Sequence, residues 1–199
     1  TDQILHLDAF SWRDDAPPDP NTVFVLSIWS DQPTSTATPY SRPATLLWTE
    51  TFLPGSYTVP PTPDGIGEEF FYDPDNPAQL LPEKQIWRYS FNPKRPFCQK
   101  GSTNAPVIYW LAVSAKTSNP GLLFGWKTST NHWHDDAVYG HLYASGAAKG
   151  DWKDLHDPRS GISLDMAFLI NNGPPTEECN PHPNLKYVQW PDPSQFGLD

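Results

Sequence analysis

Residues 23–29, which read Val-Phe-Val-Leu-Ser-Ile-Trp, decide the fold. In an extended chain the side chains alternate between two faces, which places Phe24, Leu26 and Ile28 together on one of them. A strand of an antiparallel sheet has this pattern when one of its faces packs on a core. The stretch therefore predicts a β-strand whose Phe24 face is buried.

Similar short runs, rich in β-branched and aromatic residues, recur along the chain between clusters of Pro, Gly, Asn and Asp. They predict ten strands, at residues 4–12, 23–29, 44–52, 68–73, 85–91, 106–116, 122–128, 137–143, 163–170 and 185–190. Residues 107–113 are apolar on both faces, so we expect them to form a central strand covered from both sides. The pattern leaves little room for helices and predicts an all-β protein, an antiparallel, jelly-roll-like β-sandwich.

The loops of this sandwich are rich in proline. The chain has 24 prolines in 199 residues, about 12% against an average near 5%. Aromatic residues make up 14% of the chain and supply a core, since each ring buries about 150–250 Å². We expect a sandwich domain over residues 1–172, followed over residues 173–199 by a Pro-rich linker and an extended C-terminal segment.

The charge balance excludes one class of partner. The chain has 13 Lys and Arg against 23 Asp and Glu, a formal net charge of -10, which repels the phosphate backbone of nucleic acids. No run approaches the roughly 18 apolar residues that a membrane-spanning helix needs. We therefore expect neither a nucleic-acid partner nor a membrane span.

The two cysteines, Cys98 and Cys179, lie beside polar loop residues. An acidic, Trp-rich composition is typical of an extracellular protein, in which the two would pair as a disulfide. The alternative is two free thiols in a reducing compartment.

The densest polar cluster reads His-Trp-His-Asp-Asp at residues 132–136. His132, His134 and Asp136 match the opening of a zinc-hydrolase signature, but Ala137 stands where the next ligand is needed. In a second interpretation, Asp135 and Asp136 bind calcium through their carboxylates at the rim of the sandwich. The simplest interpretation is that both aspartates accept backbone hydrogen bonds in a loop and that no cofactor binds.

The sequence contains no catalytic motif that would indicate an enzyme. Many of its aspartates precede proline, as in ordinary turns, and no Ser stands in a Gly-x-Ser-x-Gly elbow. Tryptophans could instead form flat platforms for sugar rings, or they could fill the core. The candidates are spread over several segments: Trp12, Trp29, Trp48, Trp87, Trp126, Trp133 and Trp152.

Five blocks in fixed order carry a family resemblance: IWSDQP (28–33), IYWL (108–111), FGWKT (124–128), HDDAV (134–138) and LDMAF (164–168). Residues 1–171 resemble a β-sandwich domain family of unknown function found in large secreted bacterial surface proteins, often in several copies. The resemblance implies an extracellular protein that is not an enzyme, and it brings no catalytic residues.

The C-terminal segment also resembles this family, but its beginning rather than its end. The segment KYVQWPDP (186–193), followed by FGLD (196–199), is similar to the start of the family's domains. The chain therefore resembles a repeat unit cut out of phase, whose own first strand is missing and whose end opens the next copy.

Two functions follow from these observations. The first is a structural subunit or repeat of an extracellular filament or surface array, assembled head to tail when the C-terminal extension adds a strand to a neighbouring copy. The residues expected to make this contact are apolar: Leu185, Tyr187, Val188, Trp190, Phe196 and Leu198. The alternative is a secreted module that binds polysaccharide, with calcium near Asp135 and Asp136.

Overall fold

The computed structural model describes residues 3–13, 17–73, 80–119, 122–129, 135–140, 152–173 and 179. The described residues contain strands and no helix. The longer strands are β1 (Gln3–Arg13), β2 (Val23–Gln32), β3 (Arg42–Phe52), β5 (Gly65–Tyr72), β6 (Leu80–Phe91), β8 (Tyr109–Lys116) and β14 (Phe168–Gly173). The two-residue strands are β4 (Tyr57–Thr58), β7 (Phe97–Cys98), β9 (Gly125–Trp126), β10 (Thr128–Ser129), β11 (Val138–Tyr139), β12 (Lys153–Asp154) and β13 (Asp165–Met166).

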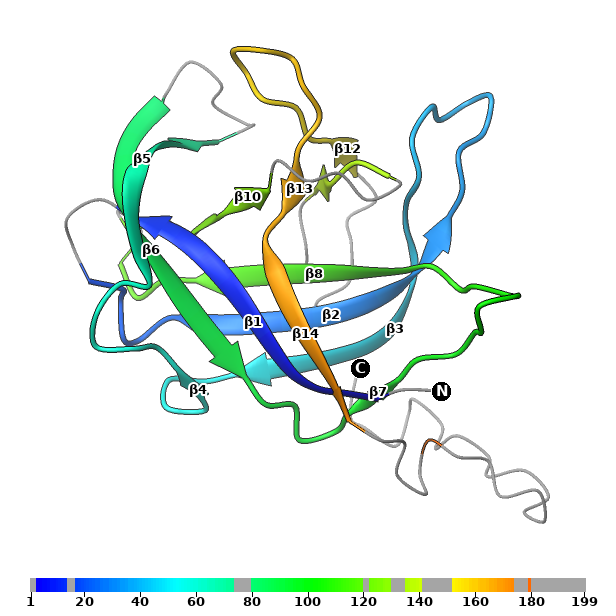
Figure 1. Cartoon of the computed structure of the whole chain (residues 1–199), viewed down its shortest axis with the longest axis horizontal. Coiled ribbons are helices and arrows are strands. Elements are labelled where there is room, and N and C mark those ends of the chain that lie inside the picture. Colours follow the sequence, from blue (N-terminus) through cyan, green and yellow to red (C-terminus); the bar gives the residue numbers. More distant parts are fainter. Residues whose placement is uncertain are drawn as a thin grey trace.

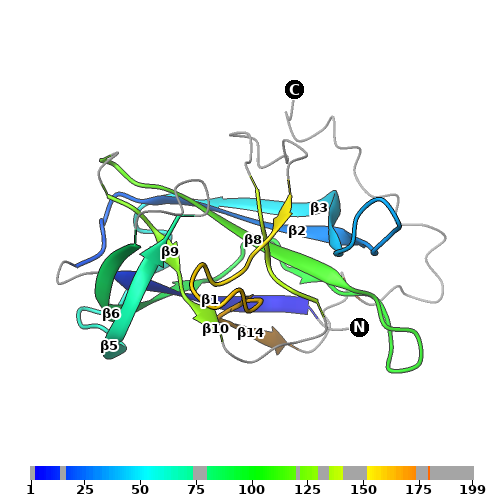
Figure 2. The same ribbon diagram turned by 90° about the horizontal axis from the view of Figure 1, so that it is seen from above.

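Most of these strands form two antiparallel sheets that pack as a sandwich, while β10 pairs with β13 and β11 with β12 in two separate short sheets (Figures 1 and 2). In the larger sheet β14, β1, β6 and β4 follow one another, while β5 pairs with β6, and β7 and β9 pair with β1. The smaller sheet has three strands in the order β3, β2, β8. Figure 2 shows β2 and β3 in one layer and β1, β6 and β14 in the other. The expected all-β sandwich is confirmed.

Strand β1 is the centre of the larger sheet because both of its edges are paired. One edge pairs with β6 over residues 7–13, and the other pairs with β14 over residues 3–9. The two-residue strands β7 and β9 extend these pairings at the two ends of β1. Residues 3–13 are therefore held along their length.

Strand β2 is the central strand of the smaller sheet. As its alternation predicted, Phe24, Leu26 and Ile28 are buried, with 0%, 1% and 3% of their surface exposed. Its other face is also covered: Trp29 packs edge to face on Trp152 at 6.0 Å between ring centres. The indole N–H of Trp29 donates to Ser27 Oγ over 2.9 Å, which satisfies that buried hydroxyl.

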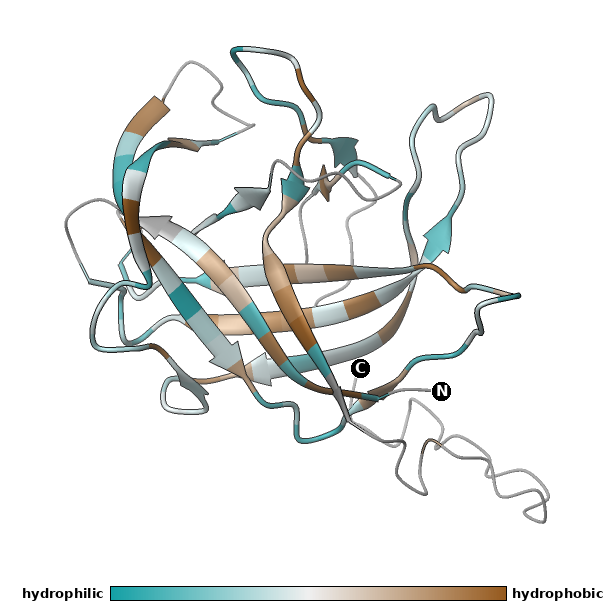
Figure 3. Ribbon diagram, in the orientation of Figure 1, coloured by the Kyte–Doolittle hydropathy of each residue, from teal (hydrophilic) through white to brown (hydrophobic). Residues whose placement is uncertain are grey.

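The prediction of a central strand at residues 107–113 was wrong. Val107 and Ile108 precede β8 and are about half exposed, at 50% and 51%. Strand β8 pairs with β2 in the described part of the chain and forms an edge of the smaller sheet. Figure 3 shows hydrophobic residues along β8 and β14. Strand β8 is therefore an edge strand of the described sheet although both of its faces are apolar.

Aromatic rings fill the core between the two sheets. Phe24 lies at the centre of the cluster and contacts four other rings at 5.0–5.2 Å between centres: Tyr57, Tyr89, Phe91 and Phe124. Most of these contacts are edge to face, the geometry that the ring quadrupoles favour. The cluster joins β2 to β6, β4 and the segment before β9.

Three further expected strands differ from the structure or lie outside the described residues. The strand expected at residues 122–128 is divided into the short strands β9 and β10, and the one at 163–170 into β13 and β14. The strand expected at residues 185–190 lies outside the described residues, as do Leu185, Tyr187, Val188, Trp190, Phe196 and Leu198.

Asp19 connects the loop before β2 with the loop after β8. Its carboxylate accepts the backbone N–H of Ser118 over 2.7 Å and that of Asn21 over 3.0 Å. These two hydrogen bonds, above all the one from Ser118, lower the pKa of Asp19 below its ordinary value of 3.8. The side chain is buried and remains ionised at neutral pH.

Replacing Asp19 by Asn removes the charge that both N–H groups favour and should lower the free energy of unfolding by about 1–2 kcal/mol at neutral pH. A depressed folded-state pKa contributes stability that is complete above the unfolded value of 3.8 and is lost as pH falls below it. The difference between the native chain and Asp19→Asn should therefore shrink below pH 3.8. Urea unfolding of both chains, at neutral pH and below pH 3.8, measures this difference in the free energy of unfolding. A difference that is the same at the two pH values would contradict this account.

Candidate functional site

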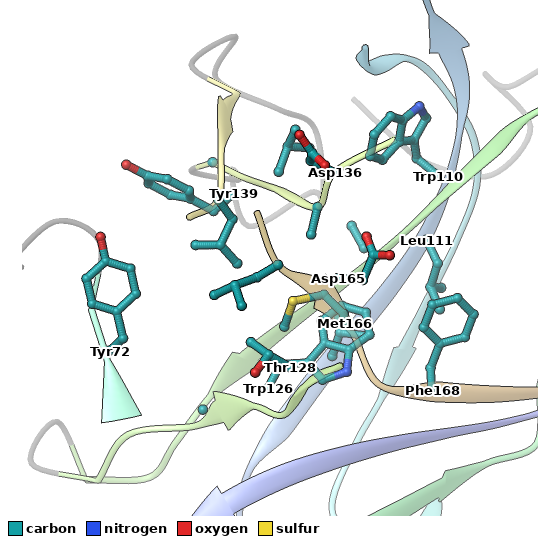
Figure 4. Close-up of a pocket in the computed structure, with 18 of the residues that line it drawn as sticks. Tyr72, Trp110, Leu111, Trp126, Thr128, Asp136, Tyr139, Asp165, Met166 and Phe168 are labelled. Atoms are coloured by element: carbon teal, nitrogen blue, oxygen red, sulfur yellow. The ribbon is translucent and has the colours of Figure 1, made fainter. Parts of the chain in front are cut away.

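A cleft of about 810 Å³ opens between the two sheets along β8 (Figure 4). Pockets that hold small ligands usually have about 300–1,000 Å³, so this opening exceeds a packing defect. All six residues 109–114 of β8 line it. Successive residues of a strand point to opposite faces, so they can share one cleft only if the edge of the strand borders it.

The β8 side of the cleft is fixed by contacts on both faces of the strand. Leu111, Val113 and Ala115 pack against the aromatic core. On the opposite face, the indole N–H of Trp110 donates to Asp31 Oδ1 of β2 over 2.7 Å. The edge of β8 that has no pairing strand among the described residues therefore belongs to a strand that is anchored to the rest of the sheet.

The opposite side of the cleft is formed by β13 and β14, with Asp165, Met166 and Phe168 (Figure 4). Hydrogen bonds connect this side to the β9–β10 segment. The indole N–H of Trp126 donates to the carbonyl of Ala167 over 2.8 Å, and the N–H of Ala167 donates to the carbonyl of Lys127 over 2.8 Å. This side is therefore held together by backbone and side-chain contacts.

Backbone hydrogen bonds of the next residue, Ala137, hold Asp135 and Asp136 beside the cleft. The N–H of Ala137 donates to the carbonyl of Leu164, and the N–H of Leu155 donates to the carbonyl of Ala137. Both aspartates are half-buried and line the cleft. The described residues hold no group of three or more His, Cys, Asp or Glu placed to bind a metal ion. His132 and His134 lie outside the described residues.

The cleft is acidic. Seven carboxylates of the described residues line it, against the single guanidinium of Arg159: Glu69, Asp73, Glu83, Asp135, Asp136, Asp157 and Asp165. The N–H of Ser160, and then that of Arg159, lower the pKa of Asp157, so this carboxylate is charged at neutral pH. Such a cleft favours a ligand that is apolar or carries positive charge.

The described tryptophans serve mainly as packing residues. Trp29 and Trp87 are buried, and the side chains of Trp48, Trp110, Trp126 and Trp152 are partly buried. Indole N–H groups donate to internal acceptors, as in the hydrogen bond from Trp48 to the carbonyl of Arg95 over 2.7 Å. Trp133 and the side chain of Trp12 lie outside the described part.

A disulfide joins Cys98 to Cys179, with 5.4 Å between the Cα atoms. Cys98 belongs to β7 and pairs with Gln3 at the start of β1. The next residue, Gln99, lines the cleft, and the ring of Phe97 contacts Tyr109 at the start of β8. The disulfide therefore anchors the C-terminal extension at Cys179, beside the Tyr109 end of the cleft.

Little in the sequence indicates this cleft. Asp165, the buried carboxylate of the site, occurs in an ordinary strand pattern, and local periodicity does not reveal that β13 faces β8. The one available signal was the apolar run at residues 107–113, because such a run must be covered by something.

Comparisons with known proteins identify a domain family for this chain, but the function of that family is unknown. Residues 8–171 match the family DUF7901, described as a domain of unknown function. No curated protein and no solved structure matches the chain. A search for membrane-spanning helices finds none in the described part of the chain.

Removing the disulfide should destabilise the sandwich. The bond joins cysteines 81 positions apart, and a closed loop of this size contributes about 4 kcal/mol by restricting the unfolded chain. The double variant Cys98→Ser, Cys179→Ser should lose roughly this amount in a denaturant titration. The native chain under reducing conditions is the matched control. Unchanged midpoints in both samples would contradict the prediction.

Proposed function

Because the chain belongs to the DUF7901 family, whose function is unknown, we propose from its geometry that it is a structural module of an extracellular filament or surface array. Copies assemble head to tail when the C-terminal extension, residues 173–199, adds to a neighbouring sandwich. The observation that carries the proposal is the open cleft of about 810 Å³ between the two sheets. Protein interiors are close-packed, so we expect side chains or a ligand to fill an opening of this size between two sheets.

A strand from another copy suits the opening better than a small apolar molecule does. The smaller sheet ends at β8. Among the described residues, no strand pairs with the outer N–H and C=O groups of β8, so these groups are available to another strand. Pairing with an extended peptide would satisfy these groups and fill the cleft with side chains. The extension offers the required apolar residues, among them Leu185, Tyr187, Val188 and Trp190.

The location outside the cell is part of the proposal. The Cys98–Cys179 disulfide supports it, because such bonds persist in oxidising environments and are rare in the cytosol. The net charge of -10 is compatible with a surface protein that does not bind nucleic acid. The proposal assigns the chain no catalytic activity and no cofactor. Its partners are copies of itself, as a free subunit or as a repeat within a longer secreted surface protein.

Deleting residues 185–199 should convert assemblies into monomers. The deletion removes the donor strand and leaves the sandwich strands β1 to β14 unchanged. Light scattering after size exclusion, together with electron micrographs, measures the state of association. Thermal unfolding checks that the shortened chain remains folded.

A second variant separates apolar character from length. It keeps all residues of the extension but replaces Leu185, Tyr187, Val188, Trp190, Phe196 and Leu198 by Ser. This variant should also remain monomeric. Micrographs with unaltered fibres from either variant, or a native chain that is monomeric at every concentration reached, would overturn the proposal.

A second candidate function is saccharide binding, and the composition of the cleft favours it. The rings of Tyr72, Trp110 and Tyr139 line the cleft together with the carboxylates of Asp136 and Asp165 (Figure 4). Aromatic faces stack on sugar rings while carboxylates accept hydrogen bonds from hydroxyl groups. In this interpretation, Asp135 and Asp136 also provide oxygen ligands for calcium.

The saccharide candidate predicts binding on a glycan array or in a titration with polysaccharides, measured with and without calcium. Tyr139→Ala should weaken such binding up to about tenfold, because a ring contact contributes up to about 1.4 kcal/mol. Phe10→Ala is the matched control, since Phe10 is a half-buried aromatic residue outside the cleft. A blank array, or equal losses in the two variants, would contradict this candidate.

A further inference from the structure

The sheet edges of this sandwich differ in how well they are protected against pairing. Proteins protect exposed edges with proline, charged residues, bulges or covering segments. In the described part of the chain the long strands with a free edge are β3, β5, β8 and β14. Comparing them shows which edge is built to accept another strand.

Strands β3 and β5 carry protecting features. Pro43 lies near the start of β3, and the pairing of β3 with β2 contains two register shifts. The backbone at residues 94–95 also lies against β3, with the N–H groups of Lys94 and Arg95 donating to Glu50. Strand β5 has glycines at positions 65 and 67, two glutamates and a register shift against β6.

Strand β14 is protected by its shortness and irregularity. It contains two asparagines, ends at Gly173 and shifts register against β1 between Ile4 and His6. Strand β8 differs from all three. Its residues 109–115 include no proline, glycine or charged residue, and its register with β2 is continuous from Ser30–Tyr109 to Val23–Lys116. The unprotected edge is also the edge that borders the cleft.

We infer that the cleft-side edge of β8 is the acceptor for residues 185–190 of a second copy of this chain, which add as an antiparallel strand. The inference rests on the function proposed above and names the site and the direction of pairing. At about 3.3 Å per residue the six residues span about 20 Å, which the eight residues of β8 accommodate. Lys186, the charged residue within the segment, meets an acidic cleft.

The position of the disulfide favours a second copy as the donor. Within one chain the extension is anchored at Cys179, beside the Tyr109 end of β8. From there a strand along β8 in the same chain would run parallel to it, and parallel pairs are slightly less stable. The six steps from Cys179 to Leu185 reach at most about 22 Å. An antiparallel strand in the same chain would therefore require these six residues to be almost fully extended along β8 before the chain turns back, which leaves little chain for the turn.

Photo-crosslinking tests both the site and the direction. Benzoylphenylalanine replaces Tyr187 or Trp190 in the full chain, and isotopically light and heavy chains are mixed before irradiation. We expect crosslinks between light and heavy chains that map to β8, with position 190 reacting nearer Tyr109 than position 187 does. Benzoylphenylalanine at Leu53, an exposed residue outside the cleft, is the control and should not label β8.

Three other outcomes would overturn the inference, and they bear differently on the proposed function. Inter-chain crosslinks to β14, β5 or β3 would reject β8 as the acceptor but leave assembly by the extension intact. Crosslinks to β8 within one chain, in a monomer, would reject the second copy and head-to-tail assembly together. Labelling of neither sheet, combined with saccharide binding, would reject both in favour of the glycan candidate.

A variant on the acceptor strand provides an independent test. Ala112 lies on β8 and lines the cleft, so Ala112→Glu places a charge at the unprotected edge and adds to the acidity of the cleft. Assembly should be lost. Ala44→Glu places the same charge on exposed β3 and should leave assembly unchanged. Thermal unfolding verifies the fold of each variant. Equal assembly in the two folded variants would overturn the inference, and if Ala112→Glu does not fold, the crosslinking result decides.

Discussion

The packing of aromatic rings around Phe24 is the constraint on which the rest of this structure depends. Its ring contacts reach β6 and β4 in the larger sheet and Phe124 in the segment before β9. Phe52 of β3 joins the same cluster through Phe91 at 5.1 Å between ring centres. The two sheets are thus held together by a dense group of rings on the side of β3 and β6. Among the described residues, no comparable cluster of rings closes the side of β8 and β14, and the cleft lies there.

The burial of a strand face was predicted correctly where local alternation of apolar and polar residues determines it. The prediction was less successful where burial depends on residues far away in the sequence. The Phe24 face of β2 was predicted correctly because alternation and core burial coincide there. Burial of Trp29 could not be predicted, since it depends on Trp152 far along the chain. The apolar run of β8 was misread for a physical reason: hydrophobicity indicates that a surface is to be covered, but not whether the same chain covers it.

The candidate site was harder to predict than the fold because its two sides come from separate parts of the chain. Asp136 and Asp165 reach the cleft through backbone hydrogen bonds such as that from Ala137 to Leu164. Nothing in the local sequence of either aspartate indicates that they share an opening with Trp110. The cysteine pair was accessible from the sequence because Cys98 and Cys179 are the two cysteines of the chain.

The disulfide also determines how mechanical load would enter the domain. A pull on the C-terminal extension reaches Cys179 first and divides there between the backbone leading to β14 and the sulfur bridge to β7. Both β14 and β7 pair with the beginning of β1, so tension is shared by two ladders on the same strand. With the bridge intact, β14 cannot be peeled from the sheet edge without force also acting on β7. Any load applied through the extension would therefore act on two strand pairings of β1 rather than on one.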